Sequence, residues 1–207
     1  MKHLKYYIII PVLTLLGCFI YLLAAGERDA TAVRQEVVRF HVVAEDNSTE
    51  AQQLKLKVRD GIFSLAEQLF SDCADPNEAL SAAEEHRQVM EDAAEQILRE
   101  NGSAENVIVD VGERYFPTKE YGALSFPAGR YQAVSVRIGA AAGENFWCVL
   151  YPALCLAPAV ADERAEDEMI AAVGESGTEF LKRSEPTQKI KFALVEWFER
   201  LKEKICK

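Results

Sequence analysis

The sequence is poor in the residues and motifs from which enzyme active sites are commonly assembled. It has three histidines, and none lies at ligand spacing from any of the five cysteines, which argues against a metal centre. It also lacks the G-x-S-x-G, H-E-x-x-H and D-[ST]-G signatures and any glycine-rich phosphate loop. We therefore predict a non-enzymatic protein without a cofactor or a metal. Glycosidase chemistry stays open, because it needs two carboxylates and 33 acidic residues are available.

Positive charge is the scarcer sign. The chain has 23 basic against 33 acidic residues and a net charge of −10, which repels phosphate backbones, so we predict no nucleic-acid partner. The charge is uneven, since an acidic stretch from about residue 161 gives way to a basic one after residue 181. This pattern predicts an acidic solvated linker over residues 159–186 and a separate basic amphipathic helix over residues 187–207.

The predicted C-terminal helix has apolar residues at helical spacing, namely Ile190, Leu194, Trp197, Phe198, Leu201 and Ile205. Basic residues lie between them, which is typical of helices that contact anionic surfaces. Three placements are compatible with this pattern. The helix could dock on the main domain, lie on a membrane surface or contact a partner protein.

One long hydrophobic run is present, from Tyr6 to Ala25, and Lys2 and Lys5 precede it. A helix of this length spans the ~30 Å hydrocarbon core of a bilayer. The flanking positive charge holds the N-terminal end in the cytoplasm, so the rest of the chain is expected to cross. Residues 1–26 are therefore predicted to be either a signal peptide cleaved near Ala24-Ala25-Gly26 or an uncleaved membrane anchor.

Export would place the cysteines where disulfides persist. Cys148 and Cys155 flank Pro152, which can bend the chain so that the two thiols meet. We predict a Cys148–Cys155 disulfide, with two free buried thiols as the alternative.

Residues 27–158 have the pattern of one domain. A strand is predicted over residues 36–44. A helix is predicted after the Asp46–Thr49 turn, with an apolar stripe that continues to Leu69. Residues 54–59 also alternate between apolar and charged residues, which is compatible with a strand. A second helix is predicted from Asp75-Pro76 to Asn101-Gly102. Three further strands fall within residues 107–111, 131–139 and 146–151. This order predicts an α+β fold in which a helix pair covers one face of a largely antiparallel sheet of about four strands.

Residues 112–130 are predicted to form a long loop between two of these strands, and long loops are often functional. Its candidate partner-binding residues are Phe116, Pro117, Lys119 and Tyr121, although the aromatic residues could instead plug one end of the sheet. On the first helix, Lys55 and Arg59 share a face and form either a solvated flank or a contact patch. His41 is interpreted as a hydrogen-bonded strand residue or as part of a site.

Four stretches carry a family resemblance: RFHVVA at residues 39–44, LKLKVRD at 54–60, FPTKEYGALSFPAGRY at 116–131 and NFWCVLYPALC at 145–155. In this order they resemble stage II sporulation protein R of endospore-forming bacteria. The resemblance covers about residues 36–156 and implies nothing for the tail after Pro158.

The resemblance implies a signalling role. A protein of this family is made in the forespore, crosses its membrane into the intermembrane space and activates a membrane-embedded aspartic protease of the mother cell, which then processes the sigma-E precursor. The implied partners are that protease and, through the N-terminal segment, a membrane. The competing hypotheses are an extracytoplasmic cell-wall hydrolase and a membrane-tethered structural module.

Overall fold

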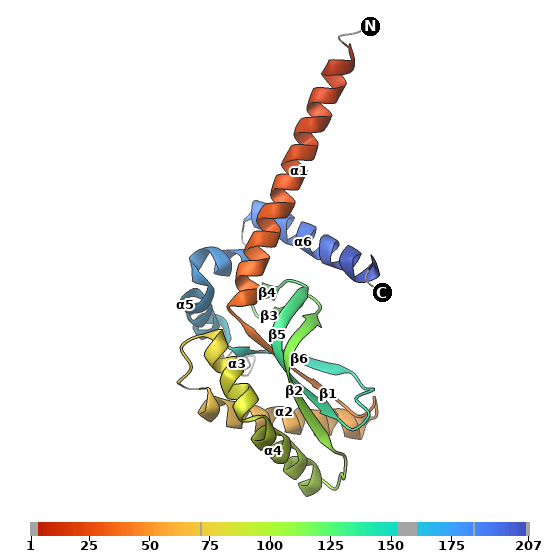
Figure 1. Cartoon of the computed structure of the whole chain (residues 1–207), viewed down its shortest axis with the longest axis vertical. Coiled ribbons are helices and arrows are strands. Elements are labelled where there is room, and N and C mark those ends of the chain that lie inside the picture. Colours follow the sequence, from red (N-terminus) through yellow and green to blue (C-terminus); the bar gives the residue numbers. More distant parts are fainter. Residues whose placement is uncertain (1–3, 71, 153–160, 184, 206–207) are drawn as a thin grey trace.

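The computed structural model describes residues 4–70, 72–152, 161–183 and 185–205 (Figure 1). Within these residues the elements follow in the order α1 (Leu4–Gln35), β1 (Val38–Val43), α2 (Thr49–Leu69), α3 (Pro76–Glu85), α4 (Arg87–Glu100), β2 (Val107–Phe116), β3 (Lys119–Tyr121), β4 (Leu124–Phe126), β5 (Gly129–Ile138), β6 (Asn145–Tyr151), α5 (Ala161–Lys182) and α6 (Pro186–Ile205).

The centre of the fold is a four-stranded sheet in the order β2-β5-β1-β6. β5 pairs antiparallel with β2, and β6 pairs antiparallel with β1, whereas β1 and β5 run parallel. The predicted α+β class with a largely antiparallel sheet is confirmed. The parallel pairing of β1 and β5 was not predicted. Parallel strands need a long crossover connection, and the segment containing α2, α3 and α4 is part of it.

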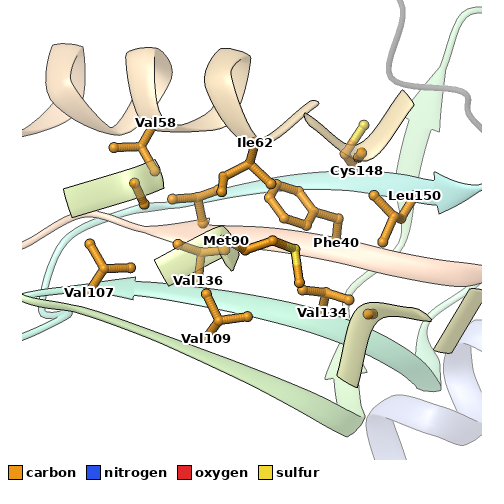
Figure 2. Close-up of a cluster of buried hydrophobic side chains, with 14 of the residues drawn as sticks. Phe40, Val58, Ile62, Met90, Val107, Val109, Val134, Val136, Cys148 and Leu150 are labelled. Carbon is orange, nitrogen blue, oxygen red and sulfur yellow. The ribbon is translucent and has the colours of Figure 1, made fainter. Parts of the chain in front are cut away.

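Helices α2, α3 and α4 cover one side of the sheet, which we call the near face. Figure 2 shows Val58 and Ile62 of α2 above Phe40 of β1, within a cluster of buried apolar side chains that includes Met90. Two helix starts follow from capping. The Ser48 hydroxyl accepts a hydrogen bond from the Ala51 N–H, and the Asp75 carboxylate accepts hydrogen bonds from two N–H groups of the first turn of α3.

The prediction of one helix from Asp75-Pro76 to Asn101-Gly102 is wrong. The chain leaves the helical conformation at His86, where φ is −95° and ψ is 11°, and this break separates α3 from α4. The expected apolar residues still face the core, since Ala83, Met90 and Ala94 are buried. Helical periodicity continues across the break and no glycine or proline marks it, so the sequence pattern alone does not reveal it.

The prediction of a long loop over residues 112–130 is also wrong. β2 continues to Phe116, which pairs with Gly129 at the start of β5. The intervening residues form a small hairpin of β3 and β4, in which Lys119 pairs with Phe126. Cross-strand pairing with β5 extends β2 beyond the predicted strand.

The opposite side of the sheet, which we call the far face, is partly covered by a second core. Buried residues of this core come from the end of α1, the β3–β4 hairpin, α5 and α6, and they include Ala30, Val33, Phe126, Phe180 and Phe192. The hairpin and these helices lie at one end of the sheet (Figure 1).

The acidic linker predicted over residues 159–186 is wrong for the part that the structure describes. Residues 161–182 form α5, and Met169, Phe180 and Leu181 of this helix are fully buried. The helix is interrupted at Gly174, whose φ of 72° is outside the helical range. Acidic composition suggested solvation, yet apolar residues at helical spacing provide one face that packs against the second core.

The apolar run of residues 6–25 lies within α1, which continues without a break to Gln35. By length and composition this helix is capable of crossing a bilayer. Its first part protrudes alone from the folded body (Figure 1), whereas Gly26, Ala30 and Val33 are buried on one helical face. The boundary predicted at residue 26 therefore falls inside a continuous helix.

Candidate partner-binding surface

The structure does not bring the six predicted contact residues into one surface. Phe116 is fully buried in the second core, so it cannot contact a partner directly. Lys55 is only 6% exposed, and its ammonium group donates hydrogen bonds to the Gln52 side chain and to the Glu144 carbonyl. Burial lowers the pKa of Lys55 from its ordinary value. Both residues are therefore structural in this fold.

Of the other four predicted residues, Arg59 and Lys119 approach opposite faces of β6. The Arg59 guanidinium is 4.6 Å from the centre of the Phe146 ring on the near face and pairs with Asp60. The Lys119 ammonium is 6.0 Å from the Trp147 ring, and Trp147 packs with the far-face core. Successive strand residues point to opposite faces, so the sheet separates these two cations. Pro117 and Tyr121 are half-buried beside Lys119 on the hairpin.

Strand register assembles a polar row across the far face. Asp110 of β2 pairs with Ser135 of β5, Ser135 pairs with His41 of β1, and His41 pairs with Trp147 of β6. Directly paired residues share a face, so these four side chains form one line across all four strands. Helices α2, α3 and α4 lie on the other side of the sheet, and within this row Ser135 is buried whereas Asp110, His41 and Trp147 are partly exposed.

His41 is held within this row by aromatic contacts. Its ring stacks on Trp147 at 5.1 Å with an interplanar angle of 7°, and Phe116 meets it edge-on at 5.5 Å. Nδ1 is 3.3 Å from the Asn145 side-chain oxygen, whereas Nε2 is buried and has no hydrogen-bond partner among the described residues. Burial lowers the pKa of His41, and three nearby arginines lower it further, although the Asn145 contact opposes them. The imidazole is therefore held in its neutral form.

Basic side chains border the row at its exposed end. Arg137 donates to the Asp110 carboxylate at 2.6 Å, and Arg114 lies 4.0 Å from the same carboxylate. The two arginine side chains are 45% and 43% exposed, so both remain accessible to a partner. We define the far-face patch as Asp110, Arg114, Arg137, His41, Trp147 and Lys119. Three cations against one carboxylate make this patch basic in an acidic chain, which suits an acidic segment of a partner protein.

Beneath the patch, Arg39 is fully buried, a feature that sequence analysis did not identify. Its Nε donates to the Cys148 carbonyl at 2.9 Å, and one terminal nitrogen donates to the Tyr121 hydroxyl at 3.0 Å. The guanidinium lies 4.6 to 5.6 Å from the ring centres of Phe116, Tyr121, Phe126 and Tyr131. The available signal was strand alternation, which places Arg39 on the same face as His41.

The predicted disulfide is only partly within the described residues. Cys148 is buried on β6, whereas Cys155 lies outside the described residues, so their pairing stays a prediction. Cys18 and Cys73 are free thiols. Within the ranges that the structure describes, no three His, Cys, Asp or Glu side chains are grouped in a way that could hold a metal ion.

Comparison with known proteins matches residues 34–161 to the family described as stage II sporulation protein R. The matched range includes the whole sheet and the far-face patch. Stage II sporulation protein R of Bacillus subtilis strain 168 is 26% identical over 192 residues, covering 85% of this chain and 86% of the relative. No solved structure matches the chain.

Proposed function

Because this chain belongs to the stage II sporulation protein R family, we propose that it is an exported signalling protein that activates a membrane-embedded aspartic protease of the mother cell. Activation would lead to processing of the sigma-E precursor. The observation that carries this proposal is the family match over residues 34–161. In this scheme the chain acts by binding, and the bond-breaking chemistry belongs to the protease.

Binding can activate the protease only if the chain has a higher affinity for its active state than for its inactive state. We propose that the far-face patch provides this contact. Trp147 supplies an aromatic anchor of the kind enriched at binding hot spots, and Lys119, Arg114 and Arg137 supply charge that attracts an acidic segment.

The localisation follows the same proposal. The apolar part of α1 would deliver the body across the forespore membrane to the intermembrane space, where the protease is exposed. Export also favours a bond between Cys148 and Cys155, which we include in the proposal.

The test is a charge reversal on the patch, Lys119→Glu with Arg137→Glu, in sporulating cells. Sigma-E precursor processing is expected to fall roughly tenfold or more, because each reversed contact replaces attraction with repulsion. An immunoblot measures processing, and an extracytoplasmic reporter fused at the C-terminus measures export in the same cells.

The matched control is Arg87→Glu with Arg99→Glu on α4, where the side chains are 50% and 61% exposed on the near-face helices. It changes the net charge equally and should leave processing intact. Normal processing in the patch variant would eliminate the far-face patch as the contact. A cytoplasmic reporter would refute the signalling proposal itself.

A further inference from the structure

Helix α6 has two apolar faces, and only one of them is covered. Phe192 and Val195 are buried in the second core, where they pack beside α1 and α5. On the other face, apolar side chains are exposed by 39 to 74%, namely Ile190, Trp197, Leu201 and Ile205. We call these four residues the outer stripe. Such a continuous exposed stripe marks an interaction surface.

The outer stripe lies beside the part of α1 that can span a bilayer. α6 crosses α1 closely at Gly26, where an added Cβ would be 2.8 Å from the Lys191 carbonyl oxygen. The Lys191 ammonium also pairs with Asp29 of α1 at 2.8 Å. Nearer the N-terminal end of α1, the Trp197 ring is 6.4 Å from Phe19. Through Trp197, the outer stripe therefore meets the protruding apolar half of α1.

The direction of α6 fits a membrane surface. α1 protrudes from the body along the long axis of the molecule, and α6 runs crosswise to it at its base (Figure 1). If α1 crosses the bilayer, α6 lies in the plane of the headgroups. Tryptophan favours that interface because its ring is apolar and its N–H is polar.

Charge along α6 is arranged for an anionic surface. Helical periodicity places Lys189, Arg200 and Lys204 along one edge of the outer stripe, where Arg200 also pairs with Glu196 at 2.8 Å. Lys191 and Lys202 lie along the other edge, where they pair with Asp29 and Glu199. An apolar stripe bordered by cations is typical of helices that rest on anionic lipid.

We propose that α6 lies on the outer surface of the same bilayer that α1 spans, with the outer stripe in the interfacial region and its basic edges on anionic phospholipid headgroups. The inference rests on the membrane insertion of α1 that the proposed function includes. A bilayer is the occupant that the surroundings favour, because the uncovered apolar surface of α1 continues directly into the outer stripe.

The experiment uses the full chain in lipid nanodiscs and reads the fluorescence of Trp197. The chain has two tryptophans, so Trp147→Phe leaves Trp197 as the reporter and Trp197→Phe leaves Trp147. With phospholipids brominated on their acyl chains in phosphatidylglycerol discs, Trp197 emission is expected to fall by about half or more, since its ring lies at the membrane interface. Trp147, on the far face of the sheet, should be quenched little.

Three comparisons make the result decisive. In the Trp147→Phe background, Leu201→Glu with Ile205→Glu should lower the quenching at least twofold, whereas Val89→Glu, at an exposed apolar site on α4, should not. Discs of phosphatidylcholine should quench Trp197 less than anionic discs, and equal quenching would overturn the role of anionic headgroups.

Unquenched Trp197 in a chain that stays in the disc would overturn the placement of α6 on lipid and favour a protein partner. Loss of the chain from the disc would overturn the membrane insertion of α1 and this inference with it. Sigma-E precursor processing reports the signalling role separately.

Discussion

Arg39 carries a positive charge into the second core, where four aromatic rings surround it. Among the described residues no carboxylate pairs with it, and its Nη1 atom has no hydrogen-bond partner. Moving a cation out of water costs several kcal/mol, and four cation–π contacts of up to ~2 kcal/mol each offset a cost of that order. The net contribution of the charge to stability is therefore small.

This balance predicts different results for two substitutions of Arg39. Arg39→Met fills the same space without a charge, so the free energy of unfolding should stay within ~1 kcal/mol of the natural value or rise. Both substitutions remove the donor to the Tyr121 hydroxyl and the Cys148 carbonyl, but Arg39→Ala also empties the aromatic cage, so it should cost about 3 kcal/mol more than Arg39→Met. Urea unfolding of the full chain in detergent measures both. An equal loss in the two variants would contradict the argument.

His41 predicts a pH dependence of stability. Burial, the largest cause, lowers its pKa in the folded state below the ordinary value of 6.5. As pH falls through 6.5, the unfolded chain takes up a proton at His41 before the folded chain does, so stability is lost. His41→Gln should reduce the loss of unfolding free energy between about pH 7.5 and about pH 5.5. Thermal unfolding at both pH values checks this, and an unchanged pH slope in the variant would count against it.

Sequence analysis identified part of the patch but not its arrangement. Lys119 and His41 were candidates, and both lie in the far-face patch. Phe116 was predicted to contact a partner, whereas in the structure its ring is buried against His41 and Trp147. Arg114, Arg137 and Asp110 were missed, since their proximity depends on strand register, which local pattern does not specify.

Among the elements, the crossing of α1 and α6 depends on one small residue. Gly26 lets the two helices approach until the Lys191 backbone occupies the space of a side chain. Arg34, about two turns further along α1, pairs with Glu27 at 2.9 Å and donates to the Ala128 carbonyl at 2.7 Å. The contact with Ala128 joins α1 to the segment between β4 and β5.

Two substitutions on α1 separate this crossing from general effects on the helix. Gly26→Leu should destabilise the body by about 1–3 kcal/mol, because the side chain has to displace Lys191 and Val195. Gly17→Leu is the matched control, since no atom lies within 4 Å of the added Cβ. Thermal unfolding of both variants in the Trp147→Phe background, followed by Trp197 fluorescence, measures the difference. Equal behaviour of the two variants would show that α6 does not depend on this contact.

Element prediction succeeded where periodicity and capping agree and failed where tertiary pairing decides. The helix after the Asp46–Thr49 turn and the strand in residues 36–44 are present as α2 and β1. The extension of β2 to Phe116 comes from its pairing with β5, and α5 is helical because its apolar face meets α1 and the β3–β4 hairpin. Neither cause is visible within a short window of sequence.

At the scale of the whole molecule, α1 combines an apolar segment long enough to span a bilayer with a segment that is part of the fold. Its last turns contribute Ala30 and Val33 to the second core, and Phe19 touches Trp197 of α6. The residues on either side of Ala25 therefore belong to one continuous helix with contacts at both ends.

We predict that the exported chain keeps its first 25 residues, because the structured contacts of α1 extend to both sides of the predicted cleavage site. We also predict that it forms the Cys148–Cys155 bond, because export places both thiols where disulfides persist. Intact mass of the membrane fraction should correspond to the full chain. Alkylation before reduction should leave Cys148 and Cys155 unmodified, and alkylation after reduction should modify both. A mass that lacks residues 1–25 would refute retention, and modification of Cys148 before reduction would refute the bond.

The position of β1 has a consequence for how the protein forms. This strand directly follows α1, yet its two neighbours, β5 and β6, begin at Gly129 and Asn145. When a chain is exported behind α1, the segments that directly follow α1 cross the membrane first. β1 therefore emerges long before β5 and β6. The middle of the sheet consequently stays open until the chain has been translocated as far as β6, so closure is non-local and late. A truncated or stalled chain would expose a central strand on both edges, which makes incomplete export a direct route to aggregation.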